Sequence, residues 1–152
     1  SEILWKQDQV QRIYIMSLKK QMEKNRWLKY FGSFSVDPGK RSVKDSFDYA
    51  SKVLSTPGNL LLFFPQGKLE SISVQVIEFQ EGLREIVPKI DGTCQMVWSS
   101  NLIEYFESMK PSVYFNMLDC GNNHSFNFSK MKDQVNVHHR AAMLKNIRFT
   151  KQ

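Results

Sequence analysis

Cysteine and histidine are scarce in this chain of 152 residues. The two cysteines, Cys94 and Cys120, form no metal-ligand spacing, and nothing indicates an oxidising compartment, so we expect two reduced core thiols. No cysteine or carboxylate lies at a zinc-type spacing from the three histidines, which argues against a metal site. We expect the adjacent pair, His138 and His139, to be structural or exposed. These scarcities exclude disulfide-stabilised and zinc-binding classes of small domain.

Long hydrophobic runs are also lacking. No stretch of about 18 apolar residues occurs, so the sequence predicts no membrane-spanning helix, and we expect no signal peptide. Repeats, low-complexity segments and interdomain linkers are missing, which predicts a single domain over residues 1–152. The sequence contains no G-x-S-x-G, Walker loop or dinucleotide fingerprint, which argues against the enzymes that use them.

Positive charge and aromatic residues are plentiful. The net charge is +6, with eleven Phe, five Tyr and three Trp, and it favours an anionic partner: a phosphorylated small molecule, an acidic membrane surface or a nucleic acid. The densest basic stretch, residues 19–31, includes Trp27 and Tyr30. It is either a surface for anionic lipid or a solvated helix face with core aromatics. Other basic residues are scattered and no RNA-binding motif occurs, so we expect no nucleic-acid partner.

The apolar run NLLLFF at residues 59–64 is the most informative stretch. It follows Pro57-Gly58 and stops at Pro65, which is typical of a parallel strand buried on both faces. Pro65 and Gly67 predict a turn, and Lys68 adds a positive charge. In open α/β sheets ligands bind at the carboxyl ends of strands. The stretch therefore predicts an anion site, although an ordinary buried strand ending in a loop has the same pattern.

A strand, a helix and a second strand succeed one another around this run. Residues 31–37 alternate as in a strand, and Ser42 with Asp45 forms a capping box for a helix. The order predicts a βαβ unit with parallel strands, and so an α/β fold with a mixed, mostly parallel sheet flanked by helices. The helix has one apolar face, made of Val43, Phe47, Ala50, Val53 and Leu54. The other expected strands are residues 12–16, 94–103 and 113–120, and the other helices are residues 17–25, 80–90 and 129–145; residues 71–79 fit a loop or a strand.

Three segments resemble the motifs of the glycerolipid acyltransferases. Residues 64–71, FPQGKLES, resemble the third motif, FPEGTRS, and residues 32–37, GSFSVD, resemble the second, GxIFIDR. Residues 79–82, FQEG, are similar to the FxxG segment that follows the third motif. The matches keep the family's order and cover about residues 13–114. The chain thus resembles a variant of the phospholipid/glycerol acyltransferase family, of the lysophosphatidic acid acyltransferase type.

This resemblance implies an enzyme of phospholipid biosynthesis, peripheral on the cytoplasmic face of the membrane. It transfers an acyl group from acyl-CoA or acyl-carrier protein to a (lyso)glycerophosphate-type acceptor, without a further cofactor. The family's second and third motifs are associated with binding the acceptor's phosphate, which calls for cationic groups and backbone N–H groups. The implied substrate-binding residues are Lys40, Arg41, Pro65, Gln66, Gly67 and Lys68.

The sequence departs from the family at the catalytic His-x4-Asp motif, whose histidine acts as general base. The residues five places after the three histidines are Ser129, Met143 and Leu144, so no catalytic residue is assigned. We expect an N-terminally truncated chain, the C-terminal part of an acyltransferase-like domain. The alternative is a non-catalytic anion- or lipid-binding module that kept the fold.

Two charged positions of the family's binding motifs also differ. The arginine position of the second motif falls on Pro38, with Lys40 and Arg41 as substitutes. In the third motif the glutamate is replaced by Gln66 and the arginine by Leu69. The joint loss of a carboxylate and a cation keeps the local charge balance, but it leaves the identity of the acceptor open.

Overall fold

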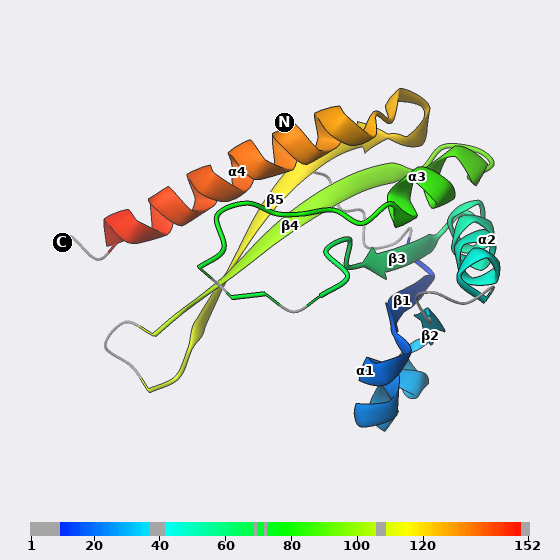
Figure 1. The fold of residues 1–152 in the computed structure, drawn as a ribbon, viewed down its shortest axis with the longest axis horizontal. Coiled ribbons are helices and arrows are strands. Elements are labelled where there is room, and N and C mark those ends of the chain that lie inside the picture. The colour runs from blue at the N-terminus through cyan, green and yellow to red at the C-terminus, as the bar shows by residue number, and fades with distance from the viewer. Residues whose placement is uncertain (1–9, 37–41, 69, 72, 106–108, 150–152) are drawn as a thin grey trace. The chain divides into compact units, whose positions relative to one another are not determined.

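The chain forms two compact units, each with its own sheet and helices (Figure 1). The computed structural model describes residues 10–36, 42–68, 70–71, 73–105 and 109–149. The first unit comprises residues 1–67 and 80–94, and the second comprises residues 68–79 and 95–152. The expectation of a single domain stays a prediction.

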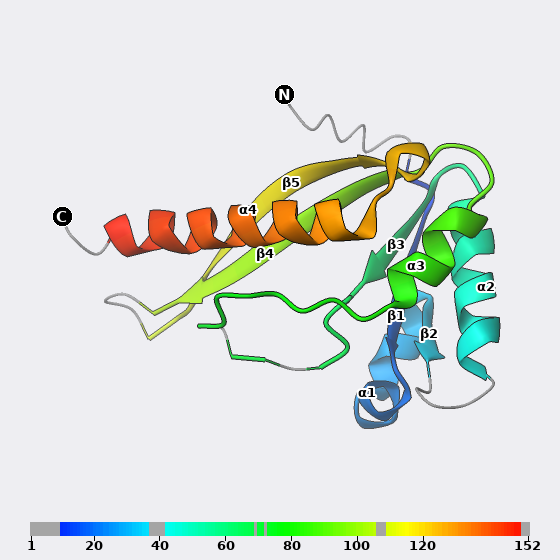
Figure 2. The same cartoon turned by 45° about the horizontal axis from the view of Figure 1, so that its top comes forward.

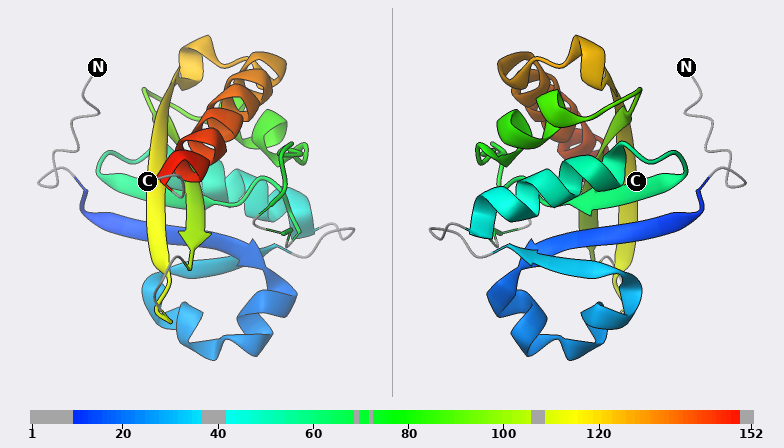
Figure 3. Two further views of the ribbon diagram at one scale, coloured as in Figure 1. Left: turned by 90° about the vertical axis from the view of Figure 1, so that its left-hand side faces the viewer. Right: turned by 90° about the vertical axis from the view of Figure 1, so that its right-hand side faces the viewer.

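Three parallel strands form the sheet of the first unit. They are β1 (Arg12–Leu18), β2 (Ser33–Val36) and β3 (Asn59–Phe63), in the order β2-β1-β3. The central strand β1 lies between the other two in Figure 3. Between β1 and β2 the chain forms α1 (Lys19–Lys24) and the 3-10 helix η2 (Arg26–Phe31), and between β2 and β3 it forms α2 (Ser42–Leu54). The predicted parallel βαβ unit is confirmed, with β1 inserted between its two strands.

One face of this sheet forms the core of the first unit. Met16 lies opposite Phe34 on β2 and Phe63 on β3, and paired residues of parallel strands share a face. Met16 is buried with Ala50 of α2 and Ile86 of α3 (Gly82–Ile86), and both phenylalanines pack against this cluster. The predicted apolar face of α2 is confirmed, because its members are buried or pack against the core.

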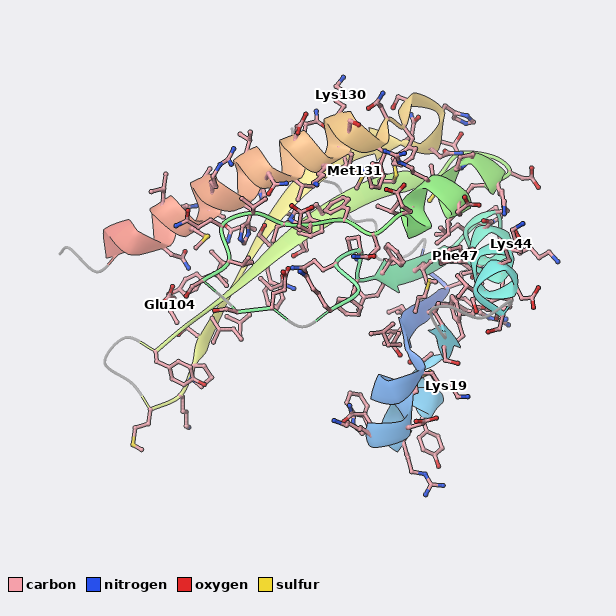
Figure 4. All side chains as sticks on the ribbon, viewed as in Figure 1. Lys19, Lys44, Phe47, Glu104, Lys130 and Met131 are labelled. Atoms are coloured by element: carbon pink, nitrogen blue, oxygen red, sulfur yellow. The ribbon has the colours of Figure 1, made fainter. Side chains whose placement is uncertain are left out.

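The side chains of α2 follow this division between core and solvent. Figure 4 shows Phe47 on the side of α2 that faces β3, where it packs against the core, while the exposed Lys44 points away. Ser51 is buried, and its hydroxyl donates to the carbonyl oxygen of Ile86 over 2.9 Å. The short helix α3 and the 3-10 turn η3 (Val87–Lys89) that follows it are therefore attached to α2 by a buried hydrogen bond as well as by apolar contact.

The other face of the parallel sheet is partly exposed, which differs from the prediction. Residues 59–64 were expected to be buried on both faces, yet Leu62 is 44% exposed and Phe64 is 54% exposed. Leu62 pairs with Ile15 and therefore lies on the face opposite to Met16. Among the described residues, α2 and α3 pack against the Met16 face, and this accounts for the burial of one face alone.

The second unit contains an antiparallel pair of long strands. β4 (Gln95–Glu104) and β5 (Ser112–Asn122) form a sheet of their own, whereas the sequence predicts one mixed sheet. Successive strands joined by a short connection pair readily as antiparallel neighbours, which accounts for the separate sheet. The 3-10 turn η4 (Asn123–Ser125) leads into α4 (Phe128–Phe149), which runs along the strand pair (Figure 2). The predicted strands and terminal helix are confirmed.

The buried face of α4 has a helical spacing of three to four residues. Met131, Val135, His139 and Ala142 are buried, and Figure 4 shows Met131 turned towards β4 while Lys130 points outwards. His139 Nε2 lies 2.8 Å from the carbonyl oxygen of Val74, which can only accept, so Nε2–H is the donor of this hydrogen bond. His139 is a structural residue, as expected.

Candidate functional site: the turn at residues 64–68

A tight turn follows β3 at the position that the sequence predicts. Pro65 is buried, and the N–H of Gly67 donates to the carbonyl oxygen of Phe64 over 3.3 Å. Gly67 has a φ of +65°, a left-handed conformation that costs other residues about 1–2 kcal/mol. The turn therefore requires glycine at this position.

Gln80 holds this turn from the segment FQEG. Its backbone N–H donates to the carbonyl oxygen of Pro65 over 2.7 Å. A Cβ atom added to Gly67 would lie 2.8 Å from Gln80 Cγ, so the two residues are in close contact. The sequence analysis did not assign a role to Gln80. Its position in the FQEG segment was the one signal that could have identified it.

The glycine of FQEG has a packing role. A Cβ atom on Gly82 would lie 3.3 Å from the ring carbons of both Phe47 and Phe63. Gly82 is the first residue of α3 and is buried. It lets the start of α3 approach the core between a helix residue and the last residue of β3. Both glycines near the candidate site are thus explained by close approach of neighbouring atoms.

The two motif-like segments leave the sheet at the same edge. Because β2 and β3 both run parallel to β1, their carboxyl ends lie on one side of the sheet, where ligands usually bind in α/β proteins. Residues 33–36 of the first segment form β2, and the other segment begins at Phe64, directly after β3. β1 lies between the two strands. Lys40 and Arg41 lie outside the described residues, as do Pro38 and Leu69.

Lys68 carries the positive charge that follows the turn. Its Nζ lies 2.9 Å from Glu70 Oε1, and its side chain is more than half exposed. The hydrogen bond with Glu70 raises the pKa of Lys68 above its ordinary value. Glu70 was not predicted as a partner of Lys68, although opposite charges two residues apart gave the signal. Of the six expected binding residues, Pro65, Gln66 and Gly67 form the turn, and Lys68 follows it.

Residues 64–68 and 80–82, which are the described residues of the candidate site, include no histidine and no cysteine. His124, His138 and His139 all belong to the second unit, whereas residues 64–67 belong to the first. Neither cysteine forms a disulfide, both are half-buried, and burial raises the pKa of each thiol. The positive charge of Lys68, directly after the turn, can attract an anion.

No cluster of three or more metal-ligating side chains was found in the described part of the chain. No helix within the described ranges is long and apolar enough to cross a bilayer.

Comparisons with known proteins add no support to the resemblance to the acyltransferases, which therefore rests on the three motif-like segments of this sequence. No protein-family model matches the chain, and neither a curated protein nor a solved structure is significantly similar to it.

Proposed function

We propose that this chain is the acceptor-binding part of an acyltransferase of glycerophospholipid synthesis. The observation that carries the proposal is the contact between Pro65 and Gln80, over 2.7 Å, which joins the FPQG turn to the FQEG segment. Two of the three segments that resemble family motifs are thereby in direct contact. Residues 33–36 of the third segment form β2, which ends at the same edge of the parallel sheet as β3.

In this proposal the phosphate of a glycerophosphate-type acceptor binds beside the turn. Lys68 supplies a charged donor, because a lysine side chain is protonated at neutral pH. Lys40 and Arg41 supply further positive charge from the end of segment 32–37. A dianionic phosphate binds best to several charged donors at once, so a single lysine would give weak affinity.

The chemistry that we propose is transfer of an acyl group from acyl-CoA or acyl-carrier protein to a hydroxyl of the acceptor. The hydroxyl oxygen attacks the thioester carbonyl, the thiol of the donor leaves, and a base takes the hydroxyl proton. No residue of this chain is assigned as that base. We therefore expect the chain by itself to bind the acceptor without transferring an acyl group to it.

The acceptor's chemistry also suggests where the protein works. A lysophospholipid resides in a bilayer, so the protein would act as a peripheral protein on the cytoplasmic face of a membrane. The net charge of +6 supports attraction to anionic lipid.

A second candidate is a non-catalytic anion- or lipid-binding module. It is favoured by the distribution of histidines, because the first unit, which contains the turn, has none. A transfer assay with the complete natural polypeptide separates the two functions. Turnover of acyl-CoA with a lysophospholipid acceptor would support the enzyme, and acceptor binding without turnover would support the module.

The direct test of the site is a titration with sn-glycerol 3-phosphate followed by the backbone amide signals of Gly67 and Lys68. The Lys68→Ala variant should bind at least about tenfold more weakly, as expected for the loss of one charge-assisted hydrogen bond. Lys132→Ala is the matched control, because Lys132 also belongs to the second unit and pairs with Glu78 over 2.6 Å. Equal affinities of Lys68→Ala and the unmodified chain would contradict the proposed site.

A further inference from the structure

A compact basic and aromatic surface lies on the connection between β1 and β2. The connection is formed by α1 and η2, which lie beyond β2 on the side away from β3 (Figure 3). Residues 19–29 contain five basic side chains and one acidic side chain, a net charge of +4 out of +6 for the whole chain. Two thirds of the net charge is therefore concentrated in these eleven residues.

The aromatic side chains of this connection are exposed. Trp27 is 58% exposed and Tyr30 is 90% exposed, so neither of them is a core aromatic. Lys24 and Arg26 of the same connection are exposed as well. An ordinary solvated helix face has charged residues without large aromatic ones, because exposing an indole to water is unfavourable. The combination thus needs an explanation beyond solubility.

We propose that Lys19, Lys24, Arg26, Trp27 and Tyr30, the α1–η2 surface, dock onto an anionic lipid bilayer. Trp and Tyr favour the boundary between headgroups and acyl chains, because each has an apolar ring and a polar group. Lysine and arginine side chains beside them are attracted to anionic headgroups. The surface combines both contributions on a single connection.

A planar anionic surface fits these residues better than a nucleic acid does. Proteins that bind nucleic acid usually have a basic stripe or groove that follows the phosphate backbone. In this chain the largest local excess of positive charge lies instead on a short helix and a 3-10 turn. A patch of this kind can contact a bilayer from one side with aromatic and basic residues at once.

The position of the surface connects it to the candidate site. α1 begins at Lys19, directly after the last residue of β1, and so leaves the sheet at the edge where the turn of residues 64–68 also begins. Docking of the α1–η2 surface would bring this edge towards the headgroup layer, where a lysophospholipid acceptor presents its phosphate. In this respect the inference rests on the proposed function.

The test is co-sedimentation of the full chain with vesicles of phosphatidylcholine alone and of phosphatidylcholine with phosphatidylglycerol, without acceptor or acyl donor. We expect binding to the anionic vesicles. A Lys24→Gln/Arg26→Gln variant should bind them about thirtyfold more weakly, from about 1 kcal/mol per basic residue. Lys130→Gln/Lys145→Gln removes the same charge from exposed positions of α4 and should have a much smaller effect.

The aromatic contribution is tested separately. A Trp27→Ala/Tyr30→Ala variant should lose binding to anionic vesicles, whereas Phe115→Ala, which removes another exposed ring, should retain it. Brominated phosphatidylglycerol should quench the fluorescence of the unmodified chain more than that of Trp27→Phe. This last measurement does not depend on the stability of a double variant.

Three results would overturn the inference: no preference for anionic vesicles, an equal loss of binding in the α4 control, or binding of an RNA oligonucleotide without vesicle binding. Because acceptor and donor are absent, a negative vesicle result leaves the glycerol 3-phosphate titration unaffected. Conversely, vesicle binding that depends on the α1–η2 surface would stand even if the titration showed no acceptor site.

Discussion

The backbone N–H of Gln80 donates to the carbonyl oxygen of Pro65 over 2.7 Å, while the side chain of Gln80 occupies the space beside Gly67. The two interactions are physically separate. The hydrogen bond needs only the backbone of residue 80, whereas the contact with Gly67 depends on the Gln80 side chain. Their contributions to the turn can therefore be measured independently by substitution.

The Gly67→Ala variant should be less stable than Gly92→Ala. Both glycines have positive φ, +65° and +82°, so both variants lose about 1–2 kcal/mol through backbone conformation. A Cβ on Gly92 meets no atom within 4 Å, but one on Gly67 lies 2.8 Å from Gln80 Cγ. Overpacking of this kind costs about 1–3 kcal/mol more. The free energy of unfolding in urea measures the difference.

A double variant isolates the steric part of this cost. In Gly67→Ala/Gln80→Ala the side chain that crowds residue 67 is truncated, while the backbone hydrogen bond to Pro65 remains available. The additional cost relative to Gly92→Ala should largely disappear, which a double-mutant cycle detects. If the cost remains, the crowding described above does not determine the need for glycine.

The Asn136→Ala variant should loosen the segment of residues 73–79. The buried side chain of Asn136 accepts from the N–H of Ile77 over 2.7 Å and donates to the carbonyl oxygen of Ile77 over 3.1 Å. Removal of the amide leaves buried backbone groups unpaired, at about 1–3 kcal/mol for each group. Amide hydrogen exchange at Ile77 should accelerate.

Gln134 provides the control for this prediction, because it is exposed on the same helix. Gln134→Ala should change the free energy of unfolding by no more than about 0.5 kcal/mol. Equal exchange rates at Ile77 in Asn136→Ala and in the unmodified chain would show that Asn136 does not hold the segment.

The Lys89→Met variant should raise the pKa of Asp48. The hydrogen bond from Lys89, 2.7 Å long, lowers the pKa of this carboxyl. A lowered pKa in the folded state stabilises the protein at neutral pH, and this contribution is lost as the pH falls through that lowered pKa. Because both side chains are exposed, the effect on stability is small. The carboxyl chemical shift of Asp48 followed through acidic pH measures the change.

Lys52→Met is the control for the hydrogen bond. Lys52 affects the pKa of Asp48 through its charge alone, and this effect is smaller than both the hydrogen bond and the charge of Lys89. The variant should therefore raise the pKa of Asp48 less than Lys89→Met does. Equal shifts in the two variants would mean that general charge, and not the hydrogen bond, determines the pKa.

Local sequence patterns predicted most elements of the fold correctly. The 3.6-residue spacing of residues 43–54 gave α2 and its buried face, and β-branched and aromatic runs gave the strands. The prediction that residues 59–64 are buried on both faces was wrong. Whether a second face of a sheet is covered depends on other parts of the chain. The alternation in residues 71–79 left loop and strand open, and Ile77 is held by Asn136, fifty-nine residues away in sequence. Such a distant pairing is not visible in a single sequence.

In the candidate site, too, local features were predictable from the sequence and contacts between distant residues were not. Pro65 and Gly67 were predictable because their backbone preferences are local. Gln80 was not, because its role arises from contact across the fold. The pairing of Lys68 with Glu70 was not predicted, although Glu70 is close in sequence, because a cation after such a turn fits a phosphate ligand as well as a neighbouring carboxylate.

The Glu70→Gln variant should bind glycerol 3-phosphate more tightly than the unmodified chain. Glu70 pairs with Lys68 over 2.9 Å, and an incoming phosphate would compete with this carboxylate for the same ammonium group. The Lys68 end of the pair is more than half exposed, and solvent screening weakens such a pair, so the gain should be at most about fivefold. Since the hydrogen bond with Glu70 raises the pKa of Lys68, the substitution should also lower that pKa, which NMR of the Nζ group can follow.

The Lys68→Ala background decides whether this gain comes from the proposed contact. If phosphate binds Lys68, then Glu70→Gln should improve the affinity of the unmodified chain and have little effect in Lys68→Ala, because the competing pair no longer exists. Glu78→Gln provides a graded control, since Glu78 acts on Lys68 through charge alone and should give a smaller gain. An equal gain in both backgrounds would mean that removing a negative charge aids binding in general, and Lys68 would then have no specific role at the phosphate.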